Sequence, residues 1–326
     1  MNRSVYPFAE LSSARTCVVA FGAVLGPSVY RYAANELLGN SMALWRGKFD
    51  VYHPTHHRIM PVVQSRRVVA THLDCTTERF PQAFRYAKEV LRAKKLLFAR
   101  ADAIICISES TRKDLLEFYP VDAAKARVIH LGVTALRRCP AQARKLRGHV
   151  RREYVLYVGH RAAYRLFDDL LHAFRETGLY TSLDLVLLGG GALTFQEEEL
   201  IAKLGLRKSV VSIPRVSDEL LGEAYASAKL FVYPSLSEGF GIPPLEAMTC
   251  GCPVLASYAS SIPEVCKDAP TYFYPKEEGS FARALLKAIN DEESRVRSIR
   301  RGREVVREYS WEKCCAETLA LYRDCL

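Results

Sequence analysis

Residues 233–246 have the sequence YPSLSEGFGIPPLE and join a hydrophobic strand pattern to a predicted helix that begins at a proline. Proline is well suited to the first helical turn, because its missing N–H would have no partner there. Gly239 and Gly241 let the backbone approach a ligand closely, and the free amides of the helix N-terminus favour an anion such as a pyrophosphate. The segment therefore predicts an anion-binding loop between a strand and a helix.

Two glutamates flank this loop and suggest its chemistry. Glu246 lies in the first turn of the predicted helix, where its carboxylate can accept hydrogen bonds from two hydroxyls of a ribose. Glu238 is expected to point into the same cleft from the loop. Each glutamate alone has a plainer interpretation, as a turn residue and as a favourable first-turn acid, each contributing roughly a few tenths of a kcal/mol.

Short apolar runs alternate with helical patterns along the second half of the chain, which favours a parallel sheet covered by helices. The predicted strands end in Gly or Ser clusters, as in doubly wound nucleotide-binding sheets, and ligands are expected at those strand ends. We predict strands at 154–158, 184–188, 210–213, 230–233 and 253–257, and helices at 165–176, 195–204, 218–227 and 244–249.

The first half shows the same alternation, so the predicted fold class is α/β throughout. A chain of 326 residues exceeds the usual size of one hydrophobic core, so two domains are expected. They are predicted at 1–137 and 153–309, with a polar linker at 138–152 and a closing amphipathic helix at 310–326 that can cross back to the first domain. First-half strands are expected at 17–24, 50–53, 67–71, 103–107 and 126–130, and its clearest helices at 84–100 and 110–118.

The positive charge of the chain is concentrated in its first half. Residues 1–150 hold 24 Lys and Arg against 11 Asp and Glu, whereas 151–326 hold 22 against 25, which together give the net charge of +10. Such a surplus can serve nucleic acid, an anionic membrane or an acidic substrate, or it can be a solvated surface. The basic stretch 85–100 is a candidate for contact with anionic lipid, whereas no nucleic-acid-binding module is recognisable.

Cysteine and histidine usage gives no indication of a metal site. The ten cysteines are irregularly spaced in a chain much longer than a small secreted scaffold, which favours reduced thiols. His53, His56 and His57 lie close together, but no acidic partner lies nearby. No apolar run approaches about 18 residues, and the N-terminus lacks a signal-peptide core. We expect no metal, no cofactor, no membrane span and a cytoplasmic location.

The stretch 238–265, EGFGIPPLEAMTCGCPVLASYASSIPEV, resembles the donor-site signature of the family-4 retaining glycosyltransferases, whose hallmark is two glutamates separated by seven residues. The resemblance implies the GT-B fold, in which two Rossmann-like domains with parallel sheets face each other across a cleft. It also implies transfer of a hexosyl group from a UDP- or GDP-sugar to a saccharide or lipid-linked saccharide acceptor. The implied reaction retains the anomeric configuration, proceeds by front-face attack and needs no metal.

Further pieces of the family pattern follow in the expected order. The stretch 154–174, YVLYVGHRAAYRLFDDLLHAF, resembles the strand, loop and helix in which two cations hold the donor diphosphate, here Arg161 and Arg165. Two loop arginines can also be merely solvated. The family more often has Lys at position 165, and Arg keeps the charge and adds a planar fork. The glycine turn 189–191 matches the family's turn near the nucleoside. The resemblance assigns the nucleotide sugar to Glu246, Gly239, Phe240, Gly241, Gly190, Arg215, Val216 and Gly26, and the reaction to His72, Glu238, Arg161 and Arg165.

On the acceptor side, the stretch 68–81, VVATHLDCTTERFP, resembles the family motif in which a histidine faces the transferred sugar. That histidine is His72. Asp74 can support it, although the family commonly has Asp directly after the histidine and Leu73 intervenes here. The sequence that begins at residue 104, IICISESTRKDLL, also resembles the family sequence. Ser108 in this stretch is interpreted as a helix cap.

The first domain departs from the family pattern in its length. Residues 22–38 can supply a glycine-rich loop and helix, with Gly26 at the helix start, but only 39–49 then precede Asp50. That is too short for two further strands, so the first domain is expected to be shortened. The main hypothesis is an active transferase with a nucleotide sugar donor and a saccharide or lipid-linked acceptor, peripheral at the inner face of a membrane. The alternatives are a non-catalytic nucleotide-sugar-binding subunit and, on the basic half alone, a nucleic-acid-binding protein.

Overall fold

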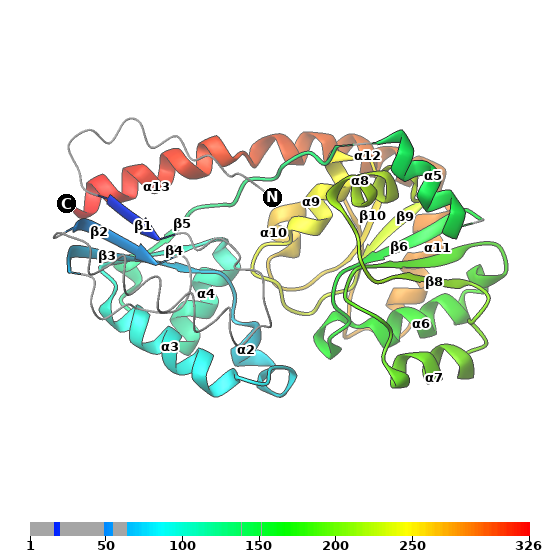
Figure 1. Cartoon of the computed structure of the whole chain (residues 1–326), viewed down its shortest axis with the longest axis horizontal. Helices are drawn as coiled ribbons and strands as arrows, with labels where there is room; N and C mark the ends of the chain where they lie inside the picture. Colours follow the sequence, from blue (N-terminus) through cyan, green and yellow to red (C-terminus); the bar gives the residue numbers. More distant parts are fainter. Residues whose placement is uncertain (1–15, 20–48, 55–63, 138, 151) are drawn as a thin grey trace.

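The computed structural model describes residues 16–19, 49–54, 64–137, 139–150 and 152–326. These residues form two α/β domains, each built on its own sheet, that lie side by side (Figure 1). Every strand pairing in both sheets is parallel. Parallel strands need crossover helices, which explains the alternation of strands and helices along the chain.

The first sheet has its strands in chain order, β1 to β5. Helices cover one face through Leu97, Phe98 and Leu115, which pack with Tyr52 and Ile104. The elements are β1 (Thr16–Val19), β2 (Phe49–Pro54), β3 (Ser65–His72), α2 (Thr76–Arg79), η1 (Pro81–Ala83), α3 (Ala87–Arg100), β4 (Ala103–Cys106), α4 (Glu109–Phe118), η2 (Ala123–Lys125) and β5 (Ala126–Val128).

The other face of the first sheet is covered by the last helix of the chain, α13 (Trp311–Cys325). Leu321 and Tyr322 pack there against Val51 and Val69. Arg67 Nε also donates to the carbonyl of Cys325 at 2.7 Å. Figure 1 shows α13 leaving the second domain and ending beside β1 and β2. Among the residues that the structure describes, the chain therefore crosses between the two domains twice, once after β5 and once before α13.

The second sheet reverses its strand order in the middle. Its order is β11-β10-β9-β6-β7-β8, so the chain winds outward from β6 to β8 and then returns to β9 on the other side of β6. This is the doubly wound arrangement, whose ligands bind at the carboxyl ends of the strands where the order reverses. The strands are β6 (Tyr154–Val158), β7 (Asp184–Leu188), β8 (Val210–Ile213), β9 (Leu230–Tyr233), β10 (Val254–Ser257) and β11 (Thr271–Phe273).

Helices cover both faces of the second sheet, as the nearly continuous apolar strands require. One face packs on α5 (Pro140–His149), α8 (Asp218–Ser227), α9 (Ile242–Thr249) and α10 (Ile262–Cys266), through buried side chains such as Leu146, Leu220 and Leu245. The other packs on α6 (Phe167–Glu176), α7 (Phe195–Lys203) and α11 (Ser280–Asn290), through Leu170, Ile201 and Leu285. The chain also forms η3 (Ala163–Arg165), η4 (Leu179–Thr181), α12 (Glu292–Val305) and η5 (Val306–Glu308).

The structure refines two expectations about the elements. The stretch 138–152, expected as a polar linker, contains α5, whose Leu146 and whose neighbour Val150 belong to the core of the second domain. Helix α9 begins at Ile242 rather than at Pro244, so Glu246 lies beyond its first turn. Residues 20–48 lie outside the described residues, and the expected shortening of the first domain stays a prediction. Among the helices that the structure describes, none has the length and apolar character needed to cross a membrane.

Candidate functional site

The reversal of strand order in the second sheet brings two of the predicted site residues together. Arg165 ends η3, which follows β6, and Glu238 follows β9, and these are the two strands on either side of the reversal. Arg165 Nη2 lies 3.0 Å from Glu238 Oε1, and the two side chains are 19% and 15% exposed. The Ser235 hydroxyl donates to the same carboxylate oxygen at 2.7 Å. A half-buried ion pair therefore occupies the position where a doubly wound sheet binds its ligand.

The surroundings of Arg165 favour an anionic ligand. Burial is the largest single effect and disfavours its charge, but Glu238 and the neighbouring tyrosine hydroxyls together outweigh it and leave the pKa of the guanidinium raised. Its Nε is buried and has no hydrogen-bond partner among the described residues. Burial raises the pKa of the neighbouring Tyr164 hydroxyl, so that hydroxyl stays neutral. The unsatisfied N–H is a donor that an additional oxyanion would satisfy.

Arg161 makes its contacts within the protein in this structure, and its contact with a diphosphate stays a prediction. Its side chain is 3% exposed, and its Nε lies 2.8 Å from the carboxylate of Glu197. Its other nitrogens donate to the carbonyls of Gly189, Gly191 and Ala192 at 3.2, 3.2 and 2.8 Å. The hydrogen-bond donors of the Arg161 guanidinium are therefore bound to acceptors within the protein. The glycines of the turn have a left-handed backbone, which directs successive carbonyl groups toward the side chain of Arg161.

The glycine turn lies at the carboxyl ends of β6, β7 and β8. A Cβ atom at Gly190 would stand 2.3 Å from the carbonyl oxygen of Gly159, so only glycine fits there. Val216 lies beside the turn, 3.8 Å from where a Cβ of Gly189 would be, and Arg215 is exposed next to it. These residues share the edge of the sheet with Arg165, as a nucleoside-binding edge would require.

Glu246 lies on α9 and is partly buried. Burial raises the pKa of its carboxyl, and the charge of Asp218 adds to that effect, whereas the neighbouring Tyr225 hydroxyl opposes it. Gly241 caps α9 with a left-handed backbone, at a φ of 99°, which explains why a glycine precedes the two prolines. The helix therefore begins two residues earlier than predicted, and Glu246 lies beyond its first turn.

Gly239 and Phe240 contact the first domain. A Cβ atom at Gly239 would lie 1.6 Å from the carbonyl oxygen of Leu73, so the two backbones touch. Ser108, which caps α4 as predicted, donates from its hydroxyl to the carbonyl of Gly239 at 2.7 Å. Phe240 is buried, with its ring 5.9 Å from that of His130. In this structure both residues hold the Glu238 segment against the first domain.

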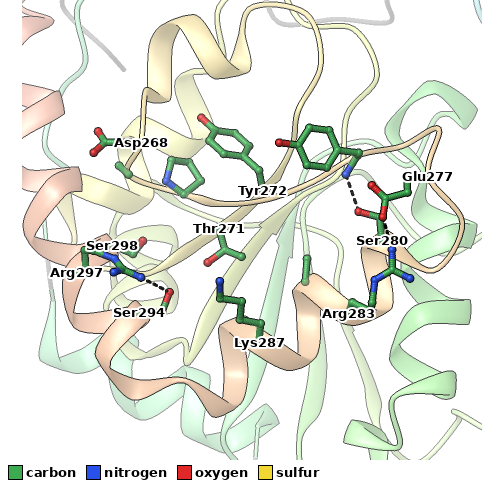
Figure 2. Close-up of a pocket in the computed structure, with 14 residues that line it drawn as sticks. Asp268, Thr271, Tyr272, Glu277, Ser280, Arg283, Lys287, Ser294, Arg297 and Ser298 are labelled. Atoms are coloured by element: carbon green, nitrogen blue, oxygen red, sulfur yellow. Dashed lines mark hydrogen bonds and ion pairs between the residues drawn. The ribbon is translucent and has the colours of Figure 1, made fainter.

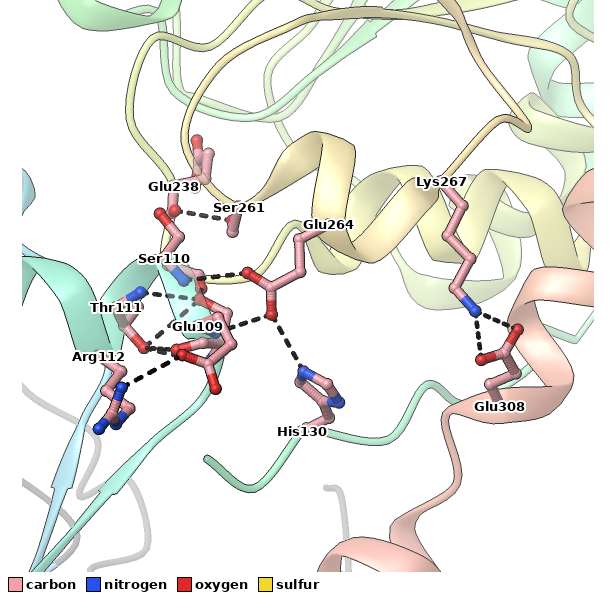
Figure 3. Close-up of polar contacts among 12 residues, drawn as sticks. Glu109, Ser110, Thr111, Arg112, His130, Glu238, Ser261, Glu264, Lys267 and Glu308 are labelled. Carbon is pink, nitrogen blue, oxygen red and sulfur yellow. Dashed lines mark hydrogen bonds and ion pairs between the residues drawn. The ribbon is translucent and has the colours of Figure 1, made fainter. Parts of the chain in front are cut away.

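A second contact between the domains is made by Glu264 on α10, and the sequence analysis missed it (Figure 3). Its carboxylate accepts hydrogen bonds from the amides of Glu109 and Ser110 at 2.7 and 3.0 Å, at the N-terminus of α4. It also lies 3.1 Å from His130 Nε2. Burial alone would raise the pKa of Glu264, but the hydrogen bonds from His130 and the two amides lower it. We call this arrangement the Glu264 bracket.

The bracket is connected to the candidate site through the start of α10. The hydroxyls of Ser260 and Ser261 donate to the carbonyl of Glu238 at 2.7 and 2.8 Å. The same short helix therefore fixes the backbone of Glu238 at one end and holds the first domain at the other. A change in the distance between the domains would therefore shift the backbone of Glu238.

His72 is buried in this structure, and its predicted contact with the transferred sugar stays a prediction. Its side chain is 0% exposed, and its ring packs edge-on against Phe98 and Tyr119, with centroids 5.2 and 6.5 Å away. The alternation of side chains along β3 explains the placement, because His72 shares a face with Val68 and Ala70, which α3 covers. The predicted supporting residue, Asp74, instead accepts from the amide of Thr76 at 2.9 Å.

The histidine cluster is described only in part. His53 is buried between Tyr322 and Thr71, whose hydroxyl oxygens lie 2.5 and 2.7 Å from its ring nitrogens. Burial lowers the pKa of His53 to about 4. His56, His57 and Gly26 lie outside the described residues. In the described part of the chain no cluster of three or more His, Cys, Asp or Glu could hold a metal ion.

Comparison with known proteins matches the chain to two family models. Residues 140–305 match the model of the glycosyl transferases group 1, and residues 10–136 match that of glycosyltransferase family 4. The first match covers half of the chain and includes Arg165, Glu238, Glu246 and Glu264. The chain belongs to the glycosyl transferases group 1. Its two domains have the GT-B fold that was expected.

Two curated relatives and two solved structures are similar to the chain. An O-antigen chain mannosyltransferase B of Escherichia coli is 29% identical over 68% of the chain and 61% of its own length. An MMP alpha-(1->4)-mannosyltransferase of Mycolicibacterium hassiacum is 27% identical over 85% and 71%. A sucrose-phosphate synthase of Thermosynechococcus elongatus has a TM-score of 0.74, at 21% identity over 92% and 80%. HepE of Anabaena, solved with UDP and glucose, has a TM-score of 0.71, at 18% identity over 92% and 84%.

Proposed function

We propose that this group 1 glycosyltransferase moves a hexosyl group from a UDP- or GDP-sugar to a saccharide or lipid-linked saccharide acceptor, with retention of configuration. The observation that carries the proposal is the ion pair of Arg165 and Glu238 at the reversal of strand order, next to the start of α9. The names of the relatives, which include mannosyltransferases and a protein solved with UDP and glucose, support the donor class.

The donor would lie along the carboxyl edge of the second sheet. Its diphosphate would bind Arg165 and lie at the N-terminal end of α9, where the helix dipole adds to the attraction. Glu246 would accept hydrogen bonds from the ribose, and Arg215 and Val216 would line the base. Arg161 would act indirectly, because it holds the glycine turn beside the nucleoside.

Donor binding would separate the ion pair seen in the structure. A phosphate oxygen would take the place of Glu238 on Arg165 and would also satisfy the buried Nε. Glu238 would then be released to accept hydrogen bonds from hydroxyls of the transferred sugar, with Ser235 still holding one carboxylate oxygen. The pair keeps both charges compensated until the donor arrives, which limits the cost of burying them.

The transfer would proceed on one face of the sugar. The bond between the anomeric carbon and the leaving phosphate oxygen breaks, the acceptor oxygen bonds to the same carbon from the same side, and the acceptor proton moves to the leaving phosphate. Arg165 and the helix dipole at the start of α9 would offset the charge that grows on the departing diphosphate, so no metal would be required. Contact between the domains at Gly239 would exclude water during the reaction.

A membrane surface is proposed as a further contact, since acceptors can be lipid-linked. Helix α3 exposes Lys88, Arg92, Lys95 and Arg100, together with Leu96, which is 60% exposed, and Tyr86 before the helix is 56% exposed. Cations beside exposed apolar side chains are typical of a helix that lies on anionic lipid. Sedimentation with anionic vesicles at low salt tests this, and Lys95→Glu should release the protein.

The proposed function is tested by binding and then by turnover. Thermal denaturation with UDP, GDP and their hexose conjugates should show one nucleotide sugar that raises the melting temperature, because a ligand of the native state stabilises it by mass action. Proton NMR of the reaction with that donor and an acceptor should show a product of unchanged anomeric configuration. A product with inverted configuration would contradict the proposed reaction.

A second candidate, a non-catalytic nucleotide-sugar-binding subunit, is favoured by one observation, the burial of His72. Such a subunit would bind the same donor without turning it over. Release of free hexose from the donor in the absence of acceptor would exclude this candidate, whereas binding with neither transfer nor hydrolysis would favour it.

A further inference from the structure

A cavity of about 420 Å³ lies on the second domain, outside the site described above. It is bounded by β11 and by helices α11 and α12, and Figure 2 shows its side chains converging from these elements. None of the predicted donor-site residues lines it. The residues that carry the argument are Thr271, Tyr272, Tyr274, Arg283, Lys287 and Arg297.

The cavity has two positive charges that its own carboxylates do not compensate. Lys287 extends from α11 toward Thr271 (Figure 2), and no hydrogen bond or ion pair of its ammonium is found in the part of the chain that the structure describes. Arg297 contacts only the hydroxyl of Ser294, at 3.4 Å, within the same described part. Of the carboxylates in the lining, Asp268 is held by Arg301 at 2.7 Å and Glu277 is paired with Arg283. An anion entering the cavity would therefore meet unpaired cations.

The same cavity has aromatic walls. Tyr272 and Tyr274 line it, and the ring of Tyr258 lies 5.2 Å from each of theirs. Tyr258 and Tyr274 are 51% and 50% exposed. Exposed tyrosines gathered in one place are unusual on a surface without a partner, because each leaves a large apolar ring in water. The C–H face of a pyranose ring is apolar and can pack on such rings, while its hydroxyls bind the phenol oxygens.

The aromatic row leads from the cavity to the candidate site. Tyr258 hydrogen-bonds to the edge strand through its amide, which donates to the carbonyl of Phe273 at 2.8 Å. Only one residue separates Tyr258 from Ser260, whose hydroxyl donates to the carbonyl of Glu238. A chain of several sugar units bound in the cavity could therefore follow the tyrosines toward the cleft between the domains. A small free anion would gain nothing from the tyrosine rings, because it has no apolar face to pack on them.

We propose that this cavity is a second carbohydrate site that binds an acidic saccharide chain, one that bears carboxylate or phosphate groups. Lys287 and Arg297 would bind the negative groups, and Tyr274 and Tyr258 would pack against the sugar rings. The proposal concerns binding alone and stands independently of the proposed transfer reaction, since it uses none of the residues assigned to the donor.

Calorimetric titration of the full chain tests the proposal with three probes. An oligogalacturonate hexamer serves as the acidic saccharide, maltohexaose as a neutral chain of the same length, and inorganic phosphate as the free anion. We expect the acidic chain to bind best, the neutral chain weakly and phosphate weakest. Higher salt should weaken the acidic chain, because the contacts are exposed and screened.

Variants distinguish this cavity from the rest of the basic surface. Lys287→Ala and Arg297→Ala should each weaken the acidic chain about three- to fivefold, and the double variant about tenfold, since exposed charge pairs contribute modestly. Tyr274→Ala should weaken both oligosaccharides. Lys208→Ala removes the same charge at the opposite edge of the sheet, and it should change nothing.

Three outcomes would overturn the proposal. One is the absence of binding by the acidic hexamer to the wild-type chain. Another is equal affinity for phosphate and hexamer, which would make the cavity a site for a free anion only. The third is a double variant that binds the hexamer as the wild type does, with an unchanged melting temperature showing that it is folded.

Discussion

Replacing Glu264 with alanine should separate the two domains at the Glu264 bracket. The carboxylate accepts two amide hydrogen bonds at 2.7 and 3.0 Å and contacts His130 at 3.1 Å. Hydrogen bonds to a charged group contribute about 1.5–3 kcal/mol each, but this side chain is 25% exposed and water can take over the amides. We therefore expect a loss of about 2 kcal/mol at the interface, or opening that is about 30-fold more frequent.

Hydrogen exchange measured by mass spectrometry reports this opening on a segment that Glu264 does not itself touch. The peptide over residues 236–242 contains Gly239, whose carbonyl accepts from Ser108 across the interface. Its exchange should accelerate in Glu264→Ala, and about fivefold in Glu264→Gln, which keeps one acceptor oxygen. Glu198→Ala, an exposed first-turn glutamate of α7 in the same domain, is the matched control. Equal exchange in Glu264→Ala and Glu198→Ala would refute the role of the bracket.

Three further predictions concern the packing around the site. Gly239→Ala should open the interface more than Glu264→Gln does, measured by the same exchange, because the new methyl group would stand 1.6 Å from the carbonyl oxygen of Leu73. Arg161→Ala should destabilise the protein by about 3 kcal/mol in urea, because it leaves the carboxylate of Glu197 without its buried partner; Arg161→Lys should cost less, and equal costs would count against the contacts with the glycine turn. Burial in the folded protein lowers the pKa of His53 from 6.5 to about 4. Between pH 6.5 and 4 the imidazole is therefore protonated in the unfolded chain but neutral in the folded protein. Stability should therefore fall by about 3 kcal/mol as the pH falls from 6.5 to 4, and His53→Gln should flatten that part of the profile.

The sequence predicted the strands and turns that form the site better than the contacts that its side chains make. The pattern of strands and glycines around Glu238 located the carboxyl edge of the second sheet, because periodicity and turn residues are local properties. The pairing of Arg165 with Glu238 could not be predicted, since it depends on two strands becoming neighbours across a reversal of strand order. The capping role of Ser108 was predicted correctly, because a cap is decided within one turn of helix.

The features of the site that the sequence did not indicate depend mostly on contacts between distant residues. Arg161 was assigned to a diphosphate from the family resemblance of 154–174, and the sequence did not indicate its contacts with Glu197 and with the carbonyls of the glycine turn. Glu264 was missed because its partners are more than 130 residues away in the chain. For His72 a signal was available, since it continues the alternation of Val68 and Ala70 on the covered face of β3.

The central claim is that Arg165 and Glu238 together bind and activate the sugar donor. The most direct measurement is the initial rate of hexose transfer from the radiolabelled donor that the thermal panel selects, for wild type, Arg165→Ala, Glu238→Ala and the surface control Lys208→Ala. Removing one charged group from an electrostatically organised site should lower the rate by about 100-fold. We predict that loss in both site variants and an unchanged rate in the control. Transfer at the wild-type rate by Arg165→Ala and Glu238→Ala would contradict the account.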